Sequence, residues 1–281
     1  MSTPHFTLSA FGDEIDNDLQ TQLDVLQSEG VHHLELRGAW GSNVLDLDDD
    51  QLRRAQTMLK EHGFGVSAIG SPIGKSELAR PQSWELERLE RALKAAEVLG
   101  TRLIRIFSFF VEEGQAEAHR DEIIERMGLL TERAQQAGVT LVHENEKGIY
   151  GDTAERCHDL LHTINSPALR MAFDPANFVQ VGVRPMRDVW PLLADDTVHF
   201  HIKDALFEGA AVRPAGEGDG AIPELLADLV ARGYQGFLTL EPHLQIAGPA
   251  GGFSGEAGMR TAVGALRRLL QPYAGTTVQI S

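Results

Sequence analysis

The chain contains a single cysteine, Cys157, among its 281 residues, so it cannot form an internal disulfide. A lone cysteine within a helical pattern is typical of a small buried hydrophobic residue in a reducing compartment. The segment from Met1 to Phe11 lacks the basic start and apolar stretch of a signal peptide. No apolar run approaches the roughly 20 residues that a membrane-spanning helix requires. These absences predict a cytoplasmic protein with no membrane partner.

Basic residues are also scarce relative to acidic ones. The chain has 25 lysines and arginines against 41 aspartates and glutamates, a formal net charge of −16 at pH 7. Such a surface repels a phosphate backbone, and no run of Lys or Arg reverses this locally. We therefore expect no nucleic-acid partner. The sequence also lacks a linker or a low-complexity tract, which predicts one domain over residues 1–281.

What the sequence does contain is an alternation of short apolar runs with longer amphipathic stretches that end at glycine. Glycine stops are typical of helix C-termini, and strands that are apolar on both faces are typical of a parallel sheet covered by helices. The predicted strands are 6–11, 33–37, 65–71, 103–108, 140–145, 170–174, 198–203 and 237–241. Eight such units predict a single (β/α)₈ TIM barrel. A doubly wound open sheet is the alternative, but the turn after the first strand, residues 11–14, lacks the usual glycine-rich sequence.

In four of the predicted strands the apolar run stops at a carboxylate or a histidine, at or near the strand end, with no local reason for a charge there. These residues are Glu144, Asp174, His201 and Glu241. In a barrel the C-terminal strand ends meet at one mouth, where three carboxylates and one imidazole provide the donors of a divalent metal site. Taken alone, each carboxylate is more often a helix N-cap or a solvated loop residue, and His201 alone could be a hydrogen-bonded core histidine. The set suits Mn²⁺ or Mg²⁺ and tolerates Co²⁺ or Zn²⁺, and its lack of cysteine argues against structural zinc.

Other polar residues near the strand ends are weaker candidates for substrate contacts. Each of them could also cap a helix or face solvent. They are Glu35, Arg37, Lys75, Arg213 and His243. Asp13 and Glu14 are expected as a helix cap and a first-turn acid.

The strings around the four strand ends resemble the sugar isomerase/epimerase superfamily with a xylose-isomerase-like TIM barrel, which includes ketose 3-epimerases and inosose dehydratases. The resemblance covers nearly the whole chain. Its specific parts are Glu144-Asn145 and the segments 173–177 (Phe-Asp-Pro-Ala-Asn), 199–204 (His-Phe-His-Ile-Lys-Asp) and 240–242 (Leu-Glu-Pro). A Glu, Asp, His and Glu set binds one divalent metal in that family, which implies the same four residues here. The family uses the second histidine of His-x-His, so the resemblance selects His201 rather than His199.

The resemblance implies an isomerase or epimerase of a sugar or keto-sugar that works by removing a proton next to a carbonyl. A divalent metal stabilises the resulting enediolate. Glu144 and Glu241 would be the acid/base pair on opposite faces of the substrate. A homo-oligomer is compatible with this reading, because relatives are often dimers or tetramers.

The resemblance also suggests supporting residues. Asn177 would contact substrate and His199 would support the site, since it lies on the same strand face as His201. Lys203 and Asp204 are expected to form a pair that orients His201. Glu146 stands where relatives often carry a histidine, a departure that concerns the substrate pocket rather than the metal.

The glycine-rich segment 213–220 follows the seventh predicted strand, where barrels often bind phosphate. Glu217 and Asp219 would place negative charge there, which favours an unphosphorylated sugar, while Arg213 leaves the point open. A flexible lid is the simpler interpretation of this segment. The second glycine-rich run, 248–255, is expected as a further loop at the mouth.

Three other functions compete with the isomerase. A lyase or dehydratase acting on a keto-sugar, inosose or 3-keto-glycoside would begin with the same proton abstraction. An apurinic-site endonuclease on this fold would need more metal ligands and a basic groove, which the net charge opposes. A non-catalytic sugar-binding barrel would not require an intact ligand set.

Overall fold

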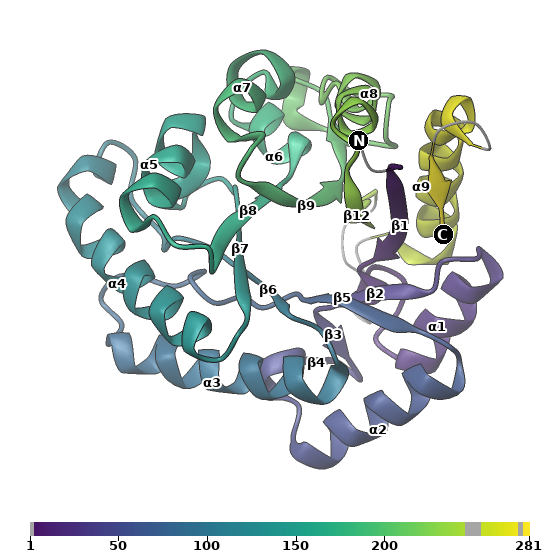
Figure 1. The fold of residues 1–281 in the computed structure, drawn as a ribbon, viewed down its shortest axis with the longest axis horizontal. Helices are drawn as coiled ribbons and strands as arrows, with labels where there is room; N and C mark the ends of the chain where they lie inside the picture. Colours follow the sequence, from purple (N-terminus) through teal and green to yellow (C-terminus); the bar gives the residue numbers. More distant parts are fainter. Residues whose placement is uncertain (1–2, 245–253, 275–277) are drawn as a thin grey trace.

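A closed barrel of parallel strands forms the centre of the molecule (Figure 1). The computed structural model describes residues 3–244, 254–274 and 278–281. The barrel strands are β1 (His5–Ala10), β2 (His33–Leu36), β5 (Gly65–Ile69), β6 (Leu103–Ile106), β7 (Thr140–Glu144), β8 (Leu169–Phe173), β9 (Thr197–Ile202) and β12 (Gln235–Leu240). Strand β12 pairs with β1 from His5 opposite Gln235 to Ala10 opposite Leu240, which closes the sheet. This confirms the (β/α)₈ barrel and excludes the open sheet.

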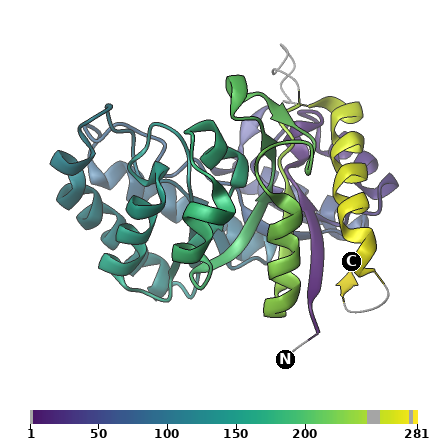
Figure 2. The same cartoon turned by 90° about the horizontal axis from the view of Figure 1, so that it is seen from above.

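Helices cover the outside of the barrel (Figures 1 and 2). They are α1 (Leu19–Ser28), α2 (Asp49–Glu61), α3 (Gln82–Leu99), α4 (Ala116–Gln136), α5 (Ala154–Ile164), α6 (Pro175–Gln180), α7 (Trp190–Leu193), α8 (Ile222–Arg232) and α9 (Gly255–Leu270). Local sequence explains their ends. Asp48 and Gln51 form a capping box at the start of α2, and Gly100 and Gly233 end α3 and α8 in the left-handed conformation.

All eight predicted strands are present, but each ends one or two residues earlier than predicted. The predicted last residues belong to the mouth loops, where the chain leaves the ladder to enter a turn or cap a helix. Short elements add to the barrel: the hairpins β3 (Gly38–Ala39) with β4 (Ser42–Asn43) and β10 (Asp204–Ala205) with β11 (Val212–Arg213), and strand β13 (Gln279–Ile280) beside β1. Of the predicted mouth loop 248–255, residues 248–253 lie outside the described residues.

The outer core lies between the sheet and the helices, whereas the inside of the barrel carries several buried polar side chains. Large buried residues such as Phe6, Leu23 and Phe200 fill the outer layer. Inside the barrel, the Ser9 and Ser67 hydroxyls are 2.7 Å apart, and Glu35, Arg105 and His199 are also buried. Branched apolar residues usually fill this space. A polar interior therefore suggests that the barrel serves the chemistry at its mouth.

Cys157 lies on α5 and is fully buried, as predicted. Burial raises the pKa of its thiol well above the ordinary value. Within the described ranges, we find no helix with the length and apolar character needed to cross a membrane.

Candidate metal centre

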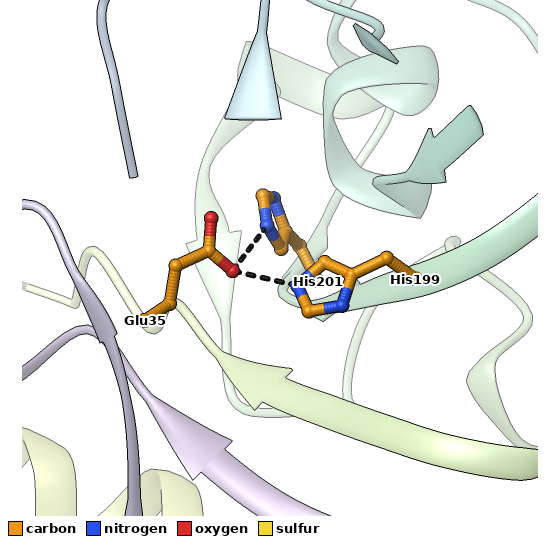
Figure 3. A group of neighbouring side chains, drawn as sticks. All are labelled: Glu35, His199 and His201. Carbon is orange, nitrogen blue, oxygen red and sulfur yellow. Dashed lines mark hydrogen bonds and ion pairs between the residues drawn. The ribbon is translucent and has the colours of Figure 1, made fainter. Parts of the chain in front are cut away.

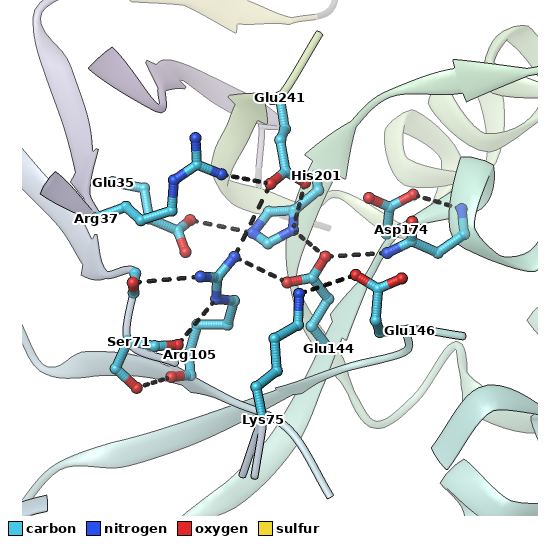
Figure 4. A network of polar contacts seen from close by, with 12 residues as sticks. Glu35, Arg37, Ser71, Lys75, Arg105, Glu144, Glu146, Asp174, His201 and Glu241 are labelled. Atoms are coloured by element: carbon cyan, nitrogen blue, oxygen red, sulfur yellow. Dashed lines mark hydrogen bonds and ion pairs between the residues drawn. The ribbon is translucent and has the colours of Figure 1, made fainter. Parts of the chain in front are cut away.

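Four side chains meet at the mouth, at the ends of four neighbouring strands (Figure 4). Glu144 ends β7, Asp174 follows β8, His201 lies near the end of β9 and Glu241 follows β12. One ligand atom from each lies within 4.8 Å of those of the other three, and all four residues are buried. The tertiary structure thus brings together the four residues that the sequence analysis selected.

Asp174 is held in place from both sides. Its Oδ1 atom caps helix α6 by accepting from the Asn177 N–H at 2.9 Å. The Asn145 side chain bonds the backbone of Asp174 twice, accepting from its N–H at 3.0 Å and donating to its carbonyl at 2.9 Å. These bonds leave Oδ2 directed toward Lys203, whose Nζ lies 2.9 Å away.

The two glutamates share one arrangement: one carboxylate oxygen faces His201 and the other faces an arginine. His201 Nδ1 lies 3.2 Å from Glu144 Oε1 and 3.8 Å from Glu241 Oε2. Glu144 Oε2 accepts from Arg105 Nη1 at 3.0 Å, and Glu241 Oε1 accepts from Arg37 Nη1 at 3.1 Å. Each carboxylate is therefore fixed in direction by a charge-assisted hydrogen bond.

Two potential ligand atoms in the cluster show whether a metal fits. Within the described part of the chain, His201 Nδ1 and Asp174 Oδ2 are buried and form no hydrogen bond of normal geometry, although Glu144 Oε1 and Lys203 Nζ lie 3.2 and 2.9 Å from them. Buried polar atoms are nearly always hydrogen-bonded, so both atoms remain available as metal ligands. Three carboxylates and one imidazole form a donor set that accepts Mn²⁺ or Mg²⁺ and also Zn²⁺ or Co²⁺. The residues therefore fit a divalent ion.

The pKa values in the cluster reflect strong coupling between buried charges. Burial alone would raise the pKa of Glu144, but His201 and Arg105 outweigh it and hold this pKa at about 2. Lys203, His243 and His201 likewise lower the pKa of Glu241 against the effect of burial. Burial raises the pKa of Asp174 to about 6, and the two glutamates add to this rise. Both glutamates are thus ionised at neutral pH, as a base or a metal ligand must be.

A cavity of about 410 Å³ opens directly above the cluster. That volume lies in the usual range for small-molecule sites. Glu144 and Glu241 line it together with both arginines, whereas His201 and Asp174 lie behind them. The rim is polar, and Lys75 Nζ contacts Glu146 Oε2 at 3.0 Å on one side of it.

The structure places the weaker candidates in different positions. Arg37, Lys75, Glu146 and His243 line the cavity. Asn177 lies beneath it and donates to Glu144 Oε1 at 3.1 Å. Arg213 is exposed on β11 and donates to the Val212 carbonyl, away from the cavity lining.

Two expected interactions differ from the prediction. Lys203 contacts Asp174 and Glu241, at 2.9 and 3.1 Å, rather than pairing with Asp204 to orient His201. Asp204 instead accepts from the backbone N–H groups of Gly216, Gly218 and Gly220 at 2.8, 3.0 and 2.8 Å. His201 is bonded by Glu35, which the sequence analysis had placed among the substrate contacts.

Asp13 and Glu14 lie in the first turn of a short 3₁₀ helix, Gly12–Glu14, as expected for a first-turn acid, but the N-cap is Phe11 rather than either of them. Both bind Arg37, at 2.8 and 2.9 Å. Glu14 additionally accepts from the Ser254 hydroxyl at 2.9 Å. Their charges therefore anchor an arginine of the site, because a buried guanidinium needs several acceptors.

Sequence reasoning missed Arg105. Its guanidinium donates to Glu144 at 3.0 Å and to the carbonyls of Gly70 and Ser71 at 3.2 and 3.4 Å. A signal was available, since Arg105 interrupts the otherwise apolar strand Leu103–Ile106. A charge at that position must lie inside the barrel or against the helices, and both places demand a partner.

Comparison with known proteins agrees with the barrel fold. A family model described as a xylose isomerase-like TIM barrel matches residues 23–269. The chain belongs to this family. Over 125 residues it is 30% identical to a fructoselysine 3-epimerase of Escherichia coli O157:H7, a match covering 42% of this chain and 44% of that protein. The chain therefore aligns with less than half of this curated relative.

Solved structures show the same fold. A D-tagatose 3-epimerase-like protein has a TM-score of 0.75 at 17% identity, with 95% of this chain and 98% of that chain covered. The IolI protein, solved with a bound zinc atom, has a TM-score of 0.75 at 15% identity, and the match covers 96% of this chain and 100% of that chain. At these identities the similarity shows the fold alone.

Proposed function

We propose that this protein is a divalent-metal-dependent isomerase or epimerase of a sugar or keto-sugar. The observation that carries the proposal is the division of the four clustered residues: Glu144 and Glu241 line the cavity, while Asp174 and His201 lie behind them. Two carboxylates that face a substrate and are fixed by separate arginines are suited to proton transfer. The 3-epimerase named among the relatives performs a reaction of this class.

Glu144, Asp174, His201 and Glu241 would hold the metal. When bound, the ion would supply Lewis-acid stabilisation of the negative charge that develops on a substrate carbonyl oxygen. The chain's own residues do the rest. Glu144 and Glu241 come from β7 and β12, so a substrate between them would meet one carboxylate on each side. One would accept the proton that leaves the substrate, and the other would have to gain a proton before it could return one to the opposite face. Arg105 and Arg37 keep their carboxylates directed at the cavity.

An unphosphorylated substrate is part of the proposal, for a different reason from the one that the sequence suggested. Glu217 is exposed and its carboxylate lies 3.5 Å from Arg268, so its charge does not repel phosphate from the glycine-rich loop. The backbone N–H groups that could cradle a phosphate are already bonded to Asp204. A Cβ on Gly218 would lie 2.3 Å from Asp204 Oδ1, so this loop is shaped around a carboxylate of the chain itself.

The test begins with metal. Dialysis against EDTA should abolish turnover of a panel of free ketoses, aldoses and 3-keto-glycosides, and Mn²⁺ should restore it. Full activity in rigorously metal-free protein would refute the metal dependence. A product of unchanged mass supports isomerisation, whereas loss of water or of an aglycone would establish a lyase instead.

The acid/base assignment needs its own variants. Glu144→Gln and Glu241→Gln should each reduce turnover by at least about 10²-fold, the usual contribution of a positioned acid or base. Glu217→Gln, on an exposed loop, is the matched control and should keep full activity. In D₂O the wild type should place deuterium on a substrate carbon. Undiminished turnover in either cavity variant would contradict the assignment.

A further inference from the structure

The side chain of Glu35 joins the candidate metal ligand His201 to a second histidine inside the barrel. Glu35 lies on β2, across the barrel from β9, which carries both histidines. Glu35 Oε2 is 3.1 Å from His201 Nε2 and 2.6 Å from His199 Nε2 (Figure 3). All three residues are fully buried. A carboxylate in this position is remote from solvent and shielded from the cavity.

We propose that Glu35 is a positioning residue, which selects the nitrogen of His201 that faces the metal, and that His199 supports it. The inference rests on the metal site of the proposed function. An ionised carboxylate can only accept a hydrogen bond, so the bond that Glu35 accepts from His201 requires the hydrogen of this ring to be on Nε2. The lone pair of the neutral ring then lies on Nδ1, the atom nearest Glu144 and Glu241.

The surroundings of the two rings leave little freedom for another arrangement. The Phe11 ring packs edge-on against His201 with centroids 5.1 Å apart, which opposes rotation of the imidazole. His199 gives Glu35 a second donor, and the Thr239 hydroxyl lies 3.3 Å from His199 Nε2. Metal-bound histidines commonly donate their other N–H to such an acceptor, and its loss costs about 10- to 100-fold in metal affinity.

The same three residues are close enough to be considered as a second metal site. The distances favour hydrogen bonds instead. Two ligands bound at about 2.1 Å to one tetrahedral ion lie about 3.4 Å apart, well beyond the 2.6 Å between Glu35 and His199. In addition, a single oxygen serves both histidines, as expected for an acceptor of two N–H groups.

The experiment measures Mn²⁺ binding to the metal-stripped full chain by isothermal titration calorimetry. Glu35→Gln should raise the Mn²⁺ Kd by about 10- to 100-fold, at a stoichiometry of one ion in both proteins. Ser9→Ala is the matched control, since it alters another buried polar side chain inside the barrel whose partner is Ser67. Its Kd should equal that of the wild type. A smaller change for Glu35→Gln than for Ser9→Ala would overturn the proposal.

His199→Gln tests the supporting role and also serves if Glu35→Gln does not fold. Alone it should weaken Mn²⁺ binding by about three- to tenfold. In the Glu35→Gln background it should add almost nothing, because its influence passes through Glu35. Fully additive losses of Mn²⁺ affinity in the double variant would refute the idea that His199 acts through Glu35. Two ions in the wild type and one in Glu35→Gln would establish a second metal site and overturn the positioning role.

The outcomes separate this inference from the proposed function. Wild type that binds no divalent ion would defeat both. Wild type that binds Mn²⁺ tightly, together with a Glu35→Gln variant of equal affinity, would defeat only the role of Glu35.

Discussion

Lys203→Met should destabilise the metal-free protein much more than the metal-loaded one. The Lys203 Nζ atom lies 2.9 Å from Asp174 Oδ2 and 3.1 Å from Glu241 Oε2, and its side chain is only 3% exposed. Without a metal, this ammonium offsets repulsion between carboxylates that burial prevents water from solvating. Methionine fills similar space but leaves both carboxylates without that charge.

The magnitude follows from the burial of these groups. Removing one partner of a buried ion pair typically costs about 3–5 kcal/mol. For a chain of this size each kcal/mol lowers the melting temperature by roughly 2–4 °C, so we expect a decrease of roughly 6–20 °C in EDTA. With Mn²⁺ bound, the ion compensates the same carboxylates, and the decrease should be less than half as large.

Calorimetric melting of both proteins in EDTA and in saturating Mn²⁺ provides the assay. Lys75→Met is the control, since Lys75 forms a partly exposed pair with Glu146 that is worth at most about 1 kcal/mol. Because metal binding and stability are linked, the wider gap between the two melting temperatures also requires tighter metal binding by Lys203→Met. Equal decreases with and without metal, or weaker binding, would refute the argument.

Two further predictions concern residues around the site. Burial lowers the pKa of His143 to about 4, so the folded state prefers the neutral ring. The free energy of unfolding is unaffected by titration of this residue above the unfolded pKa near 6.5, where the ring is neutral in both states. As the pH falls from there toward 4, the unfolded chain takes up the proton first, and the free energy of unfolding decreases by up to about 3 kcal/mol. Unfolding of His143→Gln across this window should show a shallower loss of stability than the wild type, and identical slopes would contradict the prediction. Asp204→Asn should loosen the loop 213–220, because each charged hydrogen bond to its glycine N–H groups contributes about 1.5–3 kcal/mol. Cleavage after Glu217 by a glutamate-specific protease should accelerate at least tenfold, and an unchanged rate would exclude this role.

The barrel was predictable because its signals are local. Strands, helices and the glycines that end the helices are each indicated by a few consecutive residues. A strand that is apolar on both faces is typical of a parallel sheet covered by helices. The strand ends were less well predicted. Ser71, Ser108 and Asp174 follow apolar runs, but their side chains bond the backbone of strand β6, of residue 151 and of the start of α6, and the ladder ends before them.

The four clustered carboxylate and imidazole residues were also predictable, since strand ends in a barrel necessarily converge. The roles of Glu35, Lys203 and Arg105 were not. Glu35 and His201 are 166 positions apart, and Arg37 and Glu241 are 204 positions apart. No local sequence pattern indicates which buried charged residues will contact one another, because the register and curvature of the closed sheet determine these contacts.

The sequence by itself therefore determined the barrel, the mouth and the four residues that end neighbouring strands there, because hydrophobic periodicity and strand polarity operate locally. Only the tertiary structure decided which charge serves which partner. It assigned Glu35 to His201, Lys203 to two of the carboxylates and Asp204 to the glycine-rich loop. Those contacts depend on closure of the barrel, which brings β2 across from β9 and β12 beside β1. A buried charge then pairs with the oppositely charged group that lies within about 3 Å, because leaving it unpaired is costly.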